Sequence, residues 1–118
     1  MAEDHFLNQI STKKVLQSWS SHVKVTIAEN GQVAVDLLAE NQFDLVLMDI
    51  QMPVMNGIEA TKVIRKSYNI PIIALTANAS KQEADRCIEV GMNEYLSKPF
   101  QPEDLYQKIM ECMTNVKV

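Results

Sequence analysis

The segment from Asp44 to Gly57 constrains the fold of this chain more than any other part of the sequence. It opens with an apolar run at positions 45–48, and this run ends in the carboxylate of Asp49. An uninterrupted apolar run of this length is typical of a strand that is buried on both faces, as in a parallel sheet. Ligands bind at the carboxyl ends of the strands in such sheets. Asp49 is therefore predicted to lie where chemistry takes place.

Strand and helix patterns alternate along the rest of the chain, which predicts a parallel sheet covered by helices on both faces, a doubly wound α/β fold. Two of the predicted helices start with capping-box sequences. Helices are predicted from about Leu7 to Ser21, from Asn30-Gly31, from Asn56-Gly57 through Arg65, from Ser80 to Gly91 and from Pro102 onward, and strands at Val23–Ala28, at 45–49, at Ile70–Thr76 and at Glu94–Lys98.

The first strand of this pattern is very short, because only Met1 and Ala2 precede the acidic pair Glu3-Asp4. We therefore expect residues 1–118 to form one domain that is incomplete at its N-terminus, with unpaired edges on the two neighbouring strands. Three interpretations stay open. The chain continues upstream in a longer protein, or a second chain supplies the pairing in a dimer that exchanges strands or other elements, or the chain has been shortened deliberately.

Size and charge exclude several classes of protein. The 118 residues, 47% of them hydrophobic, suit a single domain with a core that needs no metal or disulfide. A net charge of -4 without a basic block argues against direct binding to nucleic acid. Cys87 and Cys112 have no metal or redox spacing, and no membrane-spanning run or signal peptide is present, which predicts a cytoplasmic domain that does not enter the membrane.

Polar residues stand at four predicted strand ends: Glu3-Asp4, Asp49, Thr76-Ala77 and Lys98-Pro99. Together with Met52-Pro53 and Asn56-Gly57, this set closely resembles the receiver domain of response regulators in two-component signalling, over essentially the whole chain. The amino-acid sequences of residues 48–53 and 72–79 look most like those of receivers in hybrid histidine kinases. The resemblance implies a flavodoxin-like sheet of strand order 2-1-3-4-5 with about five helices on both faces, and a site between strands one and three.

The resemblance also implies a reaction at Asp49, which would be the nucleophile that accepts a phosphoryl group as an aspartyl phosphate. The cofactor would be Mg²⁺, which prefers oxygen ligands and keeps several waters. Asp4, Asp49 and the backbone carbonyl of Gln51 match the inner ligands of the family, while Glu3 would act through water. Asn56 replaces the aspartate that is usual in the family and still caps a helix well.

Four further residues receive roles from the resemblance. Lys98 would place a positive charge on the phosphoryl oxygens, Thr76 would donate its hydroxyl, and Ala77 would donate its backbone N–H. Tyr95 matches the aromatic residue that fills the space left when the threonine moves toward the phosphoryl group. The peptide bond between Lys98 and Pro99 is expected to be cis.

The partner implied by the resemblance is a histidine kinase or a histidine phosphotransfer domain. The isolated domain would not be an enzyme, although it would assist its own phosphorylation and dephosphorylation, and the parent protein could be a hybrid histidine kinase. A Mg²⁺-dependent phosphatase or phosphotransferase with an aspartyl-phosphate intermediate is a weaker alternative, because such an enzyme would need a second acid where this chain has Gln51. A module that binds partners without phosphorylation is the third hypothesis.

Overall fold

The computed structural model describes residues 1–19, 24–77, 80–98 and 100–116. Its sheet contains three regular parallel strands in the order β1-β2-β3, namely β1 (Val46–Asp49), β2 (Ile72–Thr76) and β3 (Glu94–Ser97). Every residue of β1 and β2 is buried, as the uninterrupted apolar runs predict for central strands. In register, Asp49 lies opposite Leu75, so the carboxyl ends of β1 and β2 reach the same edge of the sheet.

The N-terminal residues extend this sheet on the other side of β1. Ala2 forms parallel bridges to both Ala28 and Met48 and therefore lies between them. The spatial order is residue 28, residue 2, β1, β2, β3, which confirms the predicted order 2-1-3-4-5. The expected regular strand at Val23–Ala28 is wrong for the described residues 24–28, since only Ala28 forms a bridge. The physical reason is that Met1 and Ala2 are too short a partner to support a longer ladder.

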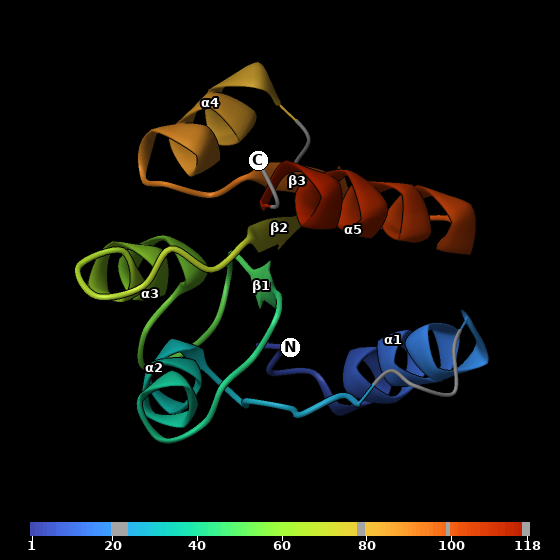
Figure 1. The fold of residues 1–118 in the computed structure, drawn as a ribbon, viewed down its shortest axis with the longest axis horizontal. Coiled ribbons are helices and arrows are strands. Elements are labelled where there is room, and N and C mark those ends of the chain that lie inside the picture. Colours follow the sequence, from blue (N-terminus) through green and yellow to red (C-terminus); the bar gives the residue numbers. More distant parts are fainter. Residues whose placement is uncertain (20–23, 78–79, 99, 117–118) are drawn as a thin grey trace.

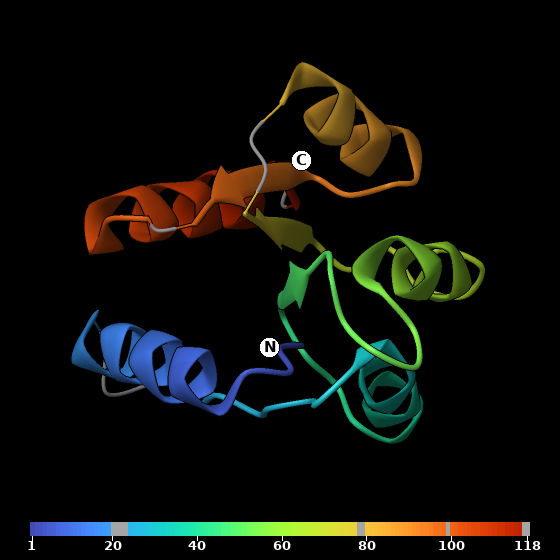
Figure 2. The same ribbon diagram turned by 180° about the vertical axis from the view of Figure 1, so that it is seen from behind.

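Helices cover both faces of the sheet, as Figures 1 and 2 show from opposite sides. One face carries α1 and α5, which pack over a core that includes Leu16, Leu75 and Ile109. The other face carries α2, α3 and α4 over a core that includes Met48 and Ile64. The helices are α1 (Phe6–Trp19), α2 (Gly31–Glu40), α3 (Gly57–Ile64), α4 (Lys81–Glu89) and α5 (Pro102–Val116).

Caps fix where the helices begin and end. Asn56 and Glu59 form the predicted capping box at the start of α3, with both reciprocal hydrogen bonds present. Ser80 accepts a hydrogen bond from the backbone N–H of Glu83 at the start of α4. Gly91, with φ of 114°, follows the end of α4 in a conformation that favours glycine. The predicted end of the first helix at Ser21 and the predicted cis bond at Pro99 both lie outside the described residues.

In the part of the chain that the structure describes, no helix has the length and apolar character needed to cross a bilayer.

Candidate functional site

Three carboxylates meet at the carboxyl edge of the sheet. Glu3 and Asp4 directly follow the bridging residue Ala2, and Asp49 ends the neighbouring strand β1. One oxygen from each carboxylate lies within 4.8 Å of the others. Glu3 and Asp49 are buried, with 2% and 4% of their surface exposed, so their charges are poorly solvated. The predicted acidic cluster is therefore present, although Asp49 lies at least 45 positions along the chain from Glu3 and Asp4.

Lys98 supplies a positive charge to this cluster. It directly follows β3, and its backbone N–H donates to the carbonyl of Thr76 at 2.7 Å. Its Nζ atom lies 3.0 Å from Asp49 Oδ2 and 3.2 Å from Glu3 Oε1. Burial alone would lower the pKa of Lys98, but the hydrogen bond and charge of Asp49, and then those of Glu3, outweigh it and raise the pKa above its usual value. Lys98 therefore stays protonated.

The turn after β1 holds the Asp49 carboxylate in place. The backbone N–H of Gln51 donates to Asp49 Oδ1 at 3.2 Å, and the N–H of Gly57 donates to the carbonyl of Ile50 at 2.9 Å. A Cβ atom on Gly57 would lie only 2.3 Å from the backbone oxygen of Asp49. Glycine is therefore required for α3 to start against the end of β1. Sequence reasoning used Gly57 only as a helix-start signal and missed this close approach.

A cavity of about 500 Å³ opens beside the three charged residues Glu3, Asp49 and Lys98. Thr76, which is buried, and Ala77, which is exposed, line it from the end of β2. The structure thus brings together Asp49, Thr76, Ala77 and Lys98 from three different strand ends. Further lining residues are Ile50 and Gln51 from the turn after β1, Leu75 from β2, side chains from positions 5–15 in and just before α1, and Phe100 before α5.

The start of α1 holds Glu3 through contacts that sequence reasoning missed. The side-chain amide of Gln9 donates to the backbone oxygen of Glu3 at 2.6 Å, and the backbone N–H of His5 donates to Glu3 Oε2 at 3.2 Å. The spacing of His5 and Gln9 behind an acidic pair carries no recognisable signal, because such contacts depend on how the helix is packed. They keep the buried Glu3 carboxylate directed at Lys98.

The donor set suits a hard divalent cation. The three acids and Lys98 carry a formal charge of −2 together, and Asp4 Oδ1 is buried with no hydrogen-bond partner. A second hollow on this side is lined by Asp4 and Gln51, so Gln51 borders both hollows. Oxygen atoms with uncompensated charge are the ligands that Mg²⁺ prefers, and the residues present therefore fit this ion.

Tyr95 stays outside this cluster. It lies in β3, opposite Ala74 in register, and 38% of its surface is exposed. It does not line the cavity beside Asp49. The structure therefore places Tyr95 on the strand that lies beyond β2 from Asp49, with its side chain partly exposed at the protein surface.

Comparisons with known proteins agree with this geometry. Residues 1–110 match the family model of the response regulator receiver domain. Hybrid signal transduction histidine kinase I of Dictyostelium discoideum is 39% identical over 119 residues, which cover 92% of this chain and 7% of that protein. The chain therefore spans only a small part of this curated relative.

Two solved structures are similar in both sequence and fold. The receiver domain of a sensor histidine kinase from Pseudomonas aeruginosa PAO1, with magnesium coordinated in its active-site cleft, is 35% identical with a TM-score of 0.87, and the match covers 96% of this chain and 93% of that one. The receiver domain of Ssk1 from Saccharomyces cerevisiae, crystallised with the histidine phosphotransfer protein Ypd1, is 33% identical with a TM-score of 0.85, covering 96% and 86% of the two chains. With its sheet order, its strand-end residues and these matches, the chain belongs to the family of response regulator receiver domains of two-component signalling.

Proposed function

We propose that Asp49 is the phosphoacceptor of this receiver domain and that a phosphohistidine, on a histidine kinase or a histidine phosphotransfer domain, is the donor. The observation that carries the proposal is the position of Asp49. Its buried carboxylate ends a central strand, borders a cavity, and lies 3.0 Å from the Lys98 ammonium. A carboxylate held there is accessible on one side and anchored on the other.

The reaction is a transfer between two nucleophiles. An oxygen of Asp49 forms a bond to phosphorus while the bond between phosphorus and the donor imidazole breaks, and the electron pair of that bond stays on the imidazole. The backbone N–H of Gln51 keeps the other carboxylate oxygen in position. Lys98, which already contacts Asp49, shifts part of its hydrogen bonding to the incoming phosphoryl oxygens.

The end of β2 contributes the remaining donors. The Thr76 hydroxyl and the Ala77 backbone N–H border the same cavity, where the phosphoryl oxygens of a modified Asp49 would lie. Movement of Thr76 toward that group would allow the half-exposed Tyr95 ring to turn inward, as a packing signal on the surface of β3. The expected consequence is lower solvent exposure of Tyr95 after phosphorylation. In a chain that lacks Trp19, it is measurable as the part of the tyrosine fluorescence change that disappears when Tyr95→Phe is added, because Tyr68 and Tyr106 also emit.

Mg²⁺ would be held by Asp4, Asp49 and the Gln51 carbonyl, and it would neutralise the charge that develops on the phosphoryl oxygens. Asp4 Oδ1 has no hydrogen-bond partner and lies 4.0 Å from the nearest cationic group, His5 Nε2, which supports an inner-ligand role, whereas Glu3 is already engaged with Lys98, which supports a role through water. Calorimetric titration with Mg²⁺ tests this assignment. Asp4→Ala should weaken binding more than Glu3→Ala, and the reverse order would show that the two roles are exchanged.

Two residues at the start of α1 suggest where the donor docks. Phe6 and Leu7 expose 70% and 76% of their surface, and they follow His5, which lines the cavity beside Asp49. An apolar patch at the rim of the site suits a helical protein that carries the phosphohistidine. The chain would thus receive its phosphoryl group from that protein and would act as a switch rather than as an enzyme that turns over substrate, although it would assist its own dephosphorylation.

The direct test is labelling by acetyl phosphate with Mg²⁺, followed by intact mass spectrometry. The wild type should gain one phosphoryl group, and Asp49→Asn should gain none. Asp44→Asn is the matched control, because it changes an exposed carboxylate just before the other end of the same strand and should be labelled normally. Equal labelling of Asp49→Asn would refute the assignment, and rapid turnover of acetyl phosphate without accumulated label would favour the phosphatase alternative.

A second assay separates the site from the docking patch. Leu7→Ser should slow transfer from a phosphorylated histidine phosphotransfer domain and leave labelling by acetyl phosphate unchanged, since the small donor needs no protein surface. Slower labelling by both donors would show instead that the change disturbs Asp49 itself.

A further inference from the structure

The hollow lined by Asp4 and Gln51 opens on a different side of the carboxylate cluster from the cavity beside Asp49. Its volume is about 610 Å³. Asp4 lines this hollow and does not line the cavity, whereas Glu3 and Lys98 show the opposite pattern. Gln51 borders both spaces. An ion held by Asp4 and the Gln51 carbonyl would therefore meet solvent through this hollow, while the phosphoryl group arrives in the cavity.

Helix α4 forms one wall of the hollow, across from the turn at residues 51–53. Two side chains of α4, those of Glu83 and Arg86, line it. Residues three positions apart lie on the same face of a helix, so both side chains reach the same space. Glu83 is half-buried and Arg86 is exposed. The helix thus presents one negative and one positive charge to the hollow.

These two charges are not neutralised by ion pairs within the part of the chain that the structure describes. The ion pairs found there join other residues, and none of them includes Glu83 or Arg86. The nearest charge on the opposite wall belongs to Asp4, whose Oδ1 atom is buried without a hydrogen-bond partner. The charges of α4 therefore act on whatever occupies the hollow.

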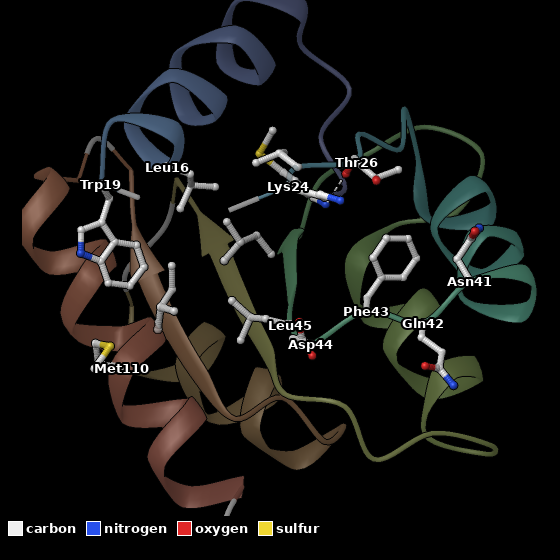
Figure 3. Close-up of a pocket in the computed structure, with 14 residues that line it drawn as sticks. Leu16, Trp19, Lys24, Thr26, Asn41, Gln42, Phe43, Asp44, Leu45 and Met110 are labelled. Carbon is white, nitrogen blue, oxygen red and sulfur yellow. Dashed lines mark hydrogen bonds between the residues drawn. The ribbon is translucent and has the colours of Figure 1, made fainter. Parts of the chain in front are cut away.

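The polar lining sets this hollow apart from a larger groove near Met1. Figure 3 shows Leu16 and Trp19 on one side of that groove and Phe43 on the other. The walls of the groove are largely apolar and belong to the two cores of the protein. Such walls suit no ion, whereas the hollow at Asp4 combines charged side chains with a carboxylate of the cluster.

We propose that this hollow is the open side of the Mg²⁺ site and that Glu83 and Arg86 set the affinity of that site by their charges, Glu83 in favour of the ion and Arg86 against it. The inference rests on the Mg²⁺ site proposed above. Mg²⁺ keeps several waters when it binds to proteins, and the hollow has room for them. Waters transmit hydrogen bonds from an ion to a carboxylate such as Glu83. Helix α4 therefore belongs to the ion site without supplying a ligand.

The size of the hollow gives the expected magnitude. Its volume corresponds to a width of about 8 Å. One unit charge at about that distance in water changes the affinity for a divalent ion about fourfold at low salt. At about 0.5 M salt the screening length falls to about 4 Å, and the effect should shrink to less than about 1.5-fold. Salt dependence therefore distinguishes a charge effect from a structural one.

Titration with Mg²⁺, followed by the amide NMR signal of Gln51, measures the Kd of the site. At low salt, Arg86→Gln should lower the Kd about fourfold, and Glu83→Gln should raise it about fourfold. Lys81→Gln and Glu89→Gln are matched controls, because they remove the same two charges from α4 at positions that do not line the hollow. Each control should change the Kd by less than about twofold.

Conservative variants separate charge from shape. Arg86→Lys and Glu83→Asp keep the charges and should keep the Kd of the wild type. Unchanged Kd values in Arg86→Gln and Glu83→Gln, or equal changes in the two controls, would overturn the proposal. Changes that persist at about 0.5 M salt, or that appear equally in the conservative variants, would overturn it as well.

The proposed Mg²⁺ site and the role of α4 fail in different ways. If Asp4→Ala weakens Mg²⁺ binding while the variants of Glu83 and Arg86 bind like the wild type, the site stands and the role of α4 is refuted. If the wild type binds no Mg²⁺, both are refuted. Labelling of Asp49 is not used in this test, so its outcome does not decide the role of α4.

Discussion

Replacing Asp49 by asparagine is expected to stabilise the metal-free protein, although the change removes an ion pair. Asparagine keeps the shape of the side chain and can still accept the hydrogen bond from the Gln51 N–H. The change removes the attraction between Asp49 and Lys98. It also removes the repulsion between Asp49 and the two other carboxylates, Glu3 and Asp4. The sign of the effect depends on which of these two terms is larger.

The distances decide the balance. With an effective dielectric constant of about 20, the attraction across 3.0 Å between Lys98 Nζ and Asp49 Oδ2 is about 5.5 kcal/mol. The carboxylate oxygens lie within 4.8 Å of one another, and each repulsion at that distance is about 3.5 kcal/mol, so two of them sum to about 7 kcal/mol. The neutral side chain should therefore raise the free energy of unfolding by about 1.5 kcal/mol, while Lys98 retains Glu3 at 3.2 Å.

Urea unfolding at neutral pH with a chelator measures this difference. Asp85→Asn is the matched control, because it removes an exposed carboxylate on α4 and should change stability by less than about 0.5 kcal/mol. Added Mg²⁺ should stabilise the wild type more than Asp49→Asn, because the variant offers the ion a neutral amide oxygen in place of a charged carboxylate. An ordinary destabilising substitution lowers the free energy of unfolding by about 1 kcal/mol. A decrease of about that size or more in metal-free Asp49→Asn would refute the reasoning that repulsion outweighs attraction at this site.

Three further changes test the same region. Lys98→Met should lower the free energy of unfolding by about 3 kcal/mol at neutral pH, because it leaves the carboxylates without their cation, and urea unfolding measures the loss. The pKa of Lys98 is raised in the folded state, so the contribution of Lys98 to stability is complete below its pKa in the unfolded chain, about 10.4, and is lost as pH rises through the raised pKa. The alkaline fall in stability should therefore be smaller in Lys98→Met, and an unchanged fall would contradict this. Gly57→Ala should cost about 2 kcal/mol or more and slow phosphorylation of Asp49, because the added Cβ meets the backbone oxygen of Asp49. Asn56→Ala should cost about 1 kcal/mol in thermal unfolding and spare phosphorylation, since it removes only a cap.

Much of the fold follows from local patterns in the sequence. The apolar runs at 45–48 and 72–75 predict buried central strands, and both are buried in the structure. Asn56 with Glu59 predicts the start of α3, because a capping box needs only residues within one helical turn. The alternation of these elements predicts the doubly wound sheet. The failure at Val23–Ala28 has a tertiary cause, because a strand needs a partner of matching length.

The candidate site could be predicted as a set of residues and not as an arrangement. The sequence by itself determined that Asp49 and Thr76 end strands and that Lys98 stands at a strand end, directly after β3, because strand ends are set by neighbouring residues. Only the tertiary structure decided that Lys98 bridges Asp49 and Glu3, a residue 95 positions away, and that Gly57 leaves no room for a Cβ atom beside Asp49. These features arise from contacts between segments that are distant along the chain. The residues between two such segments do not determine how far apart the segments lie in space.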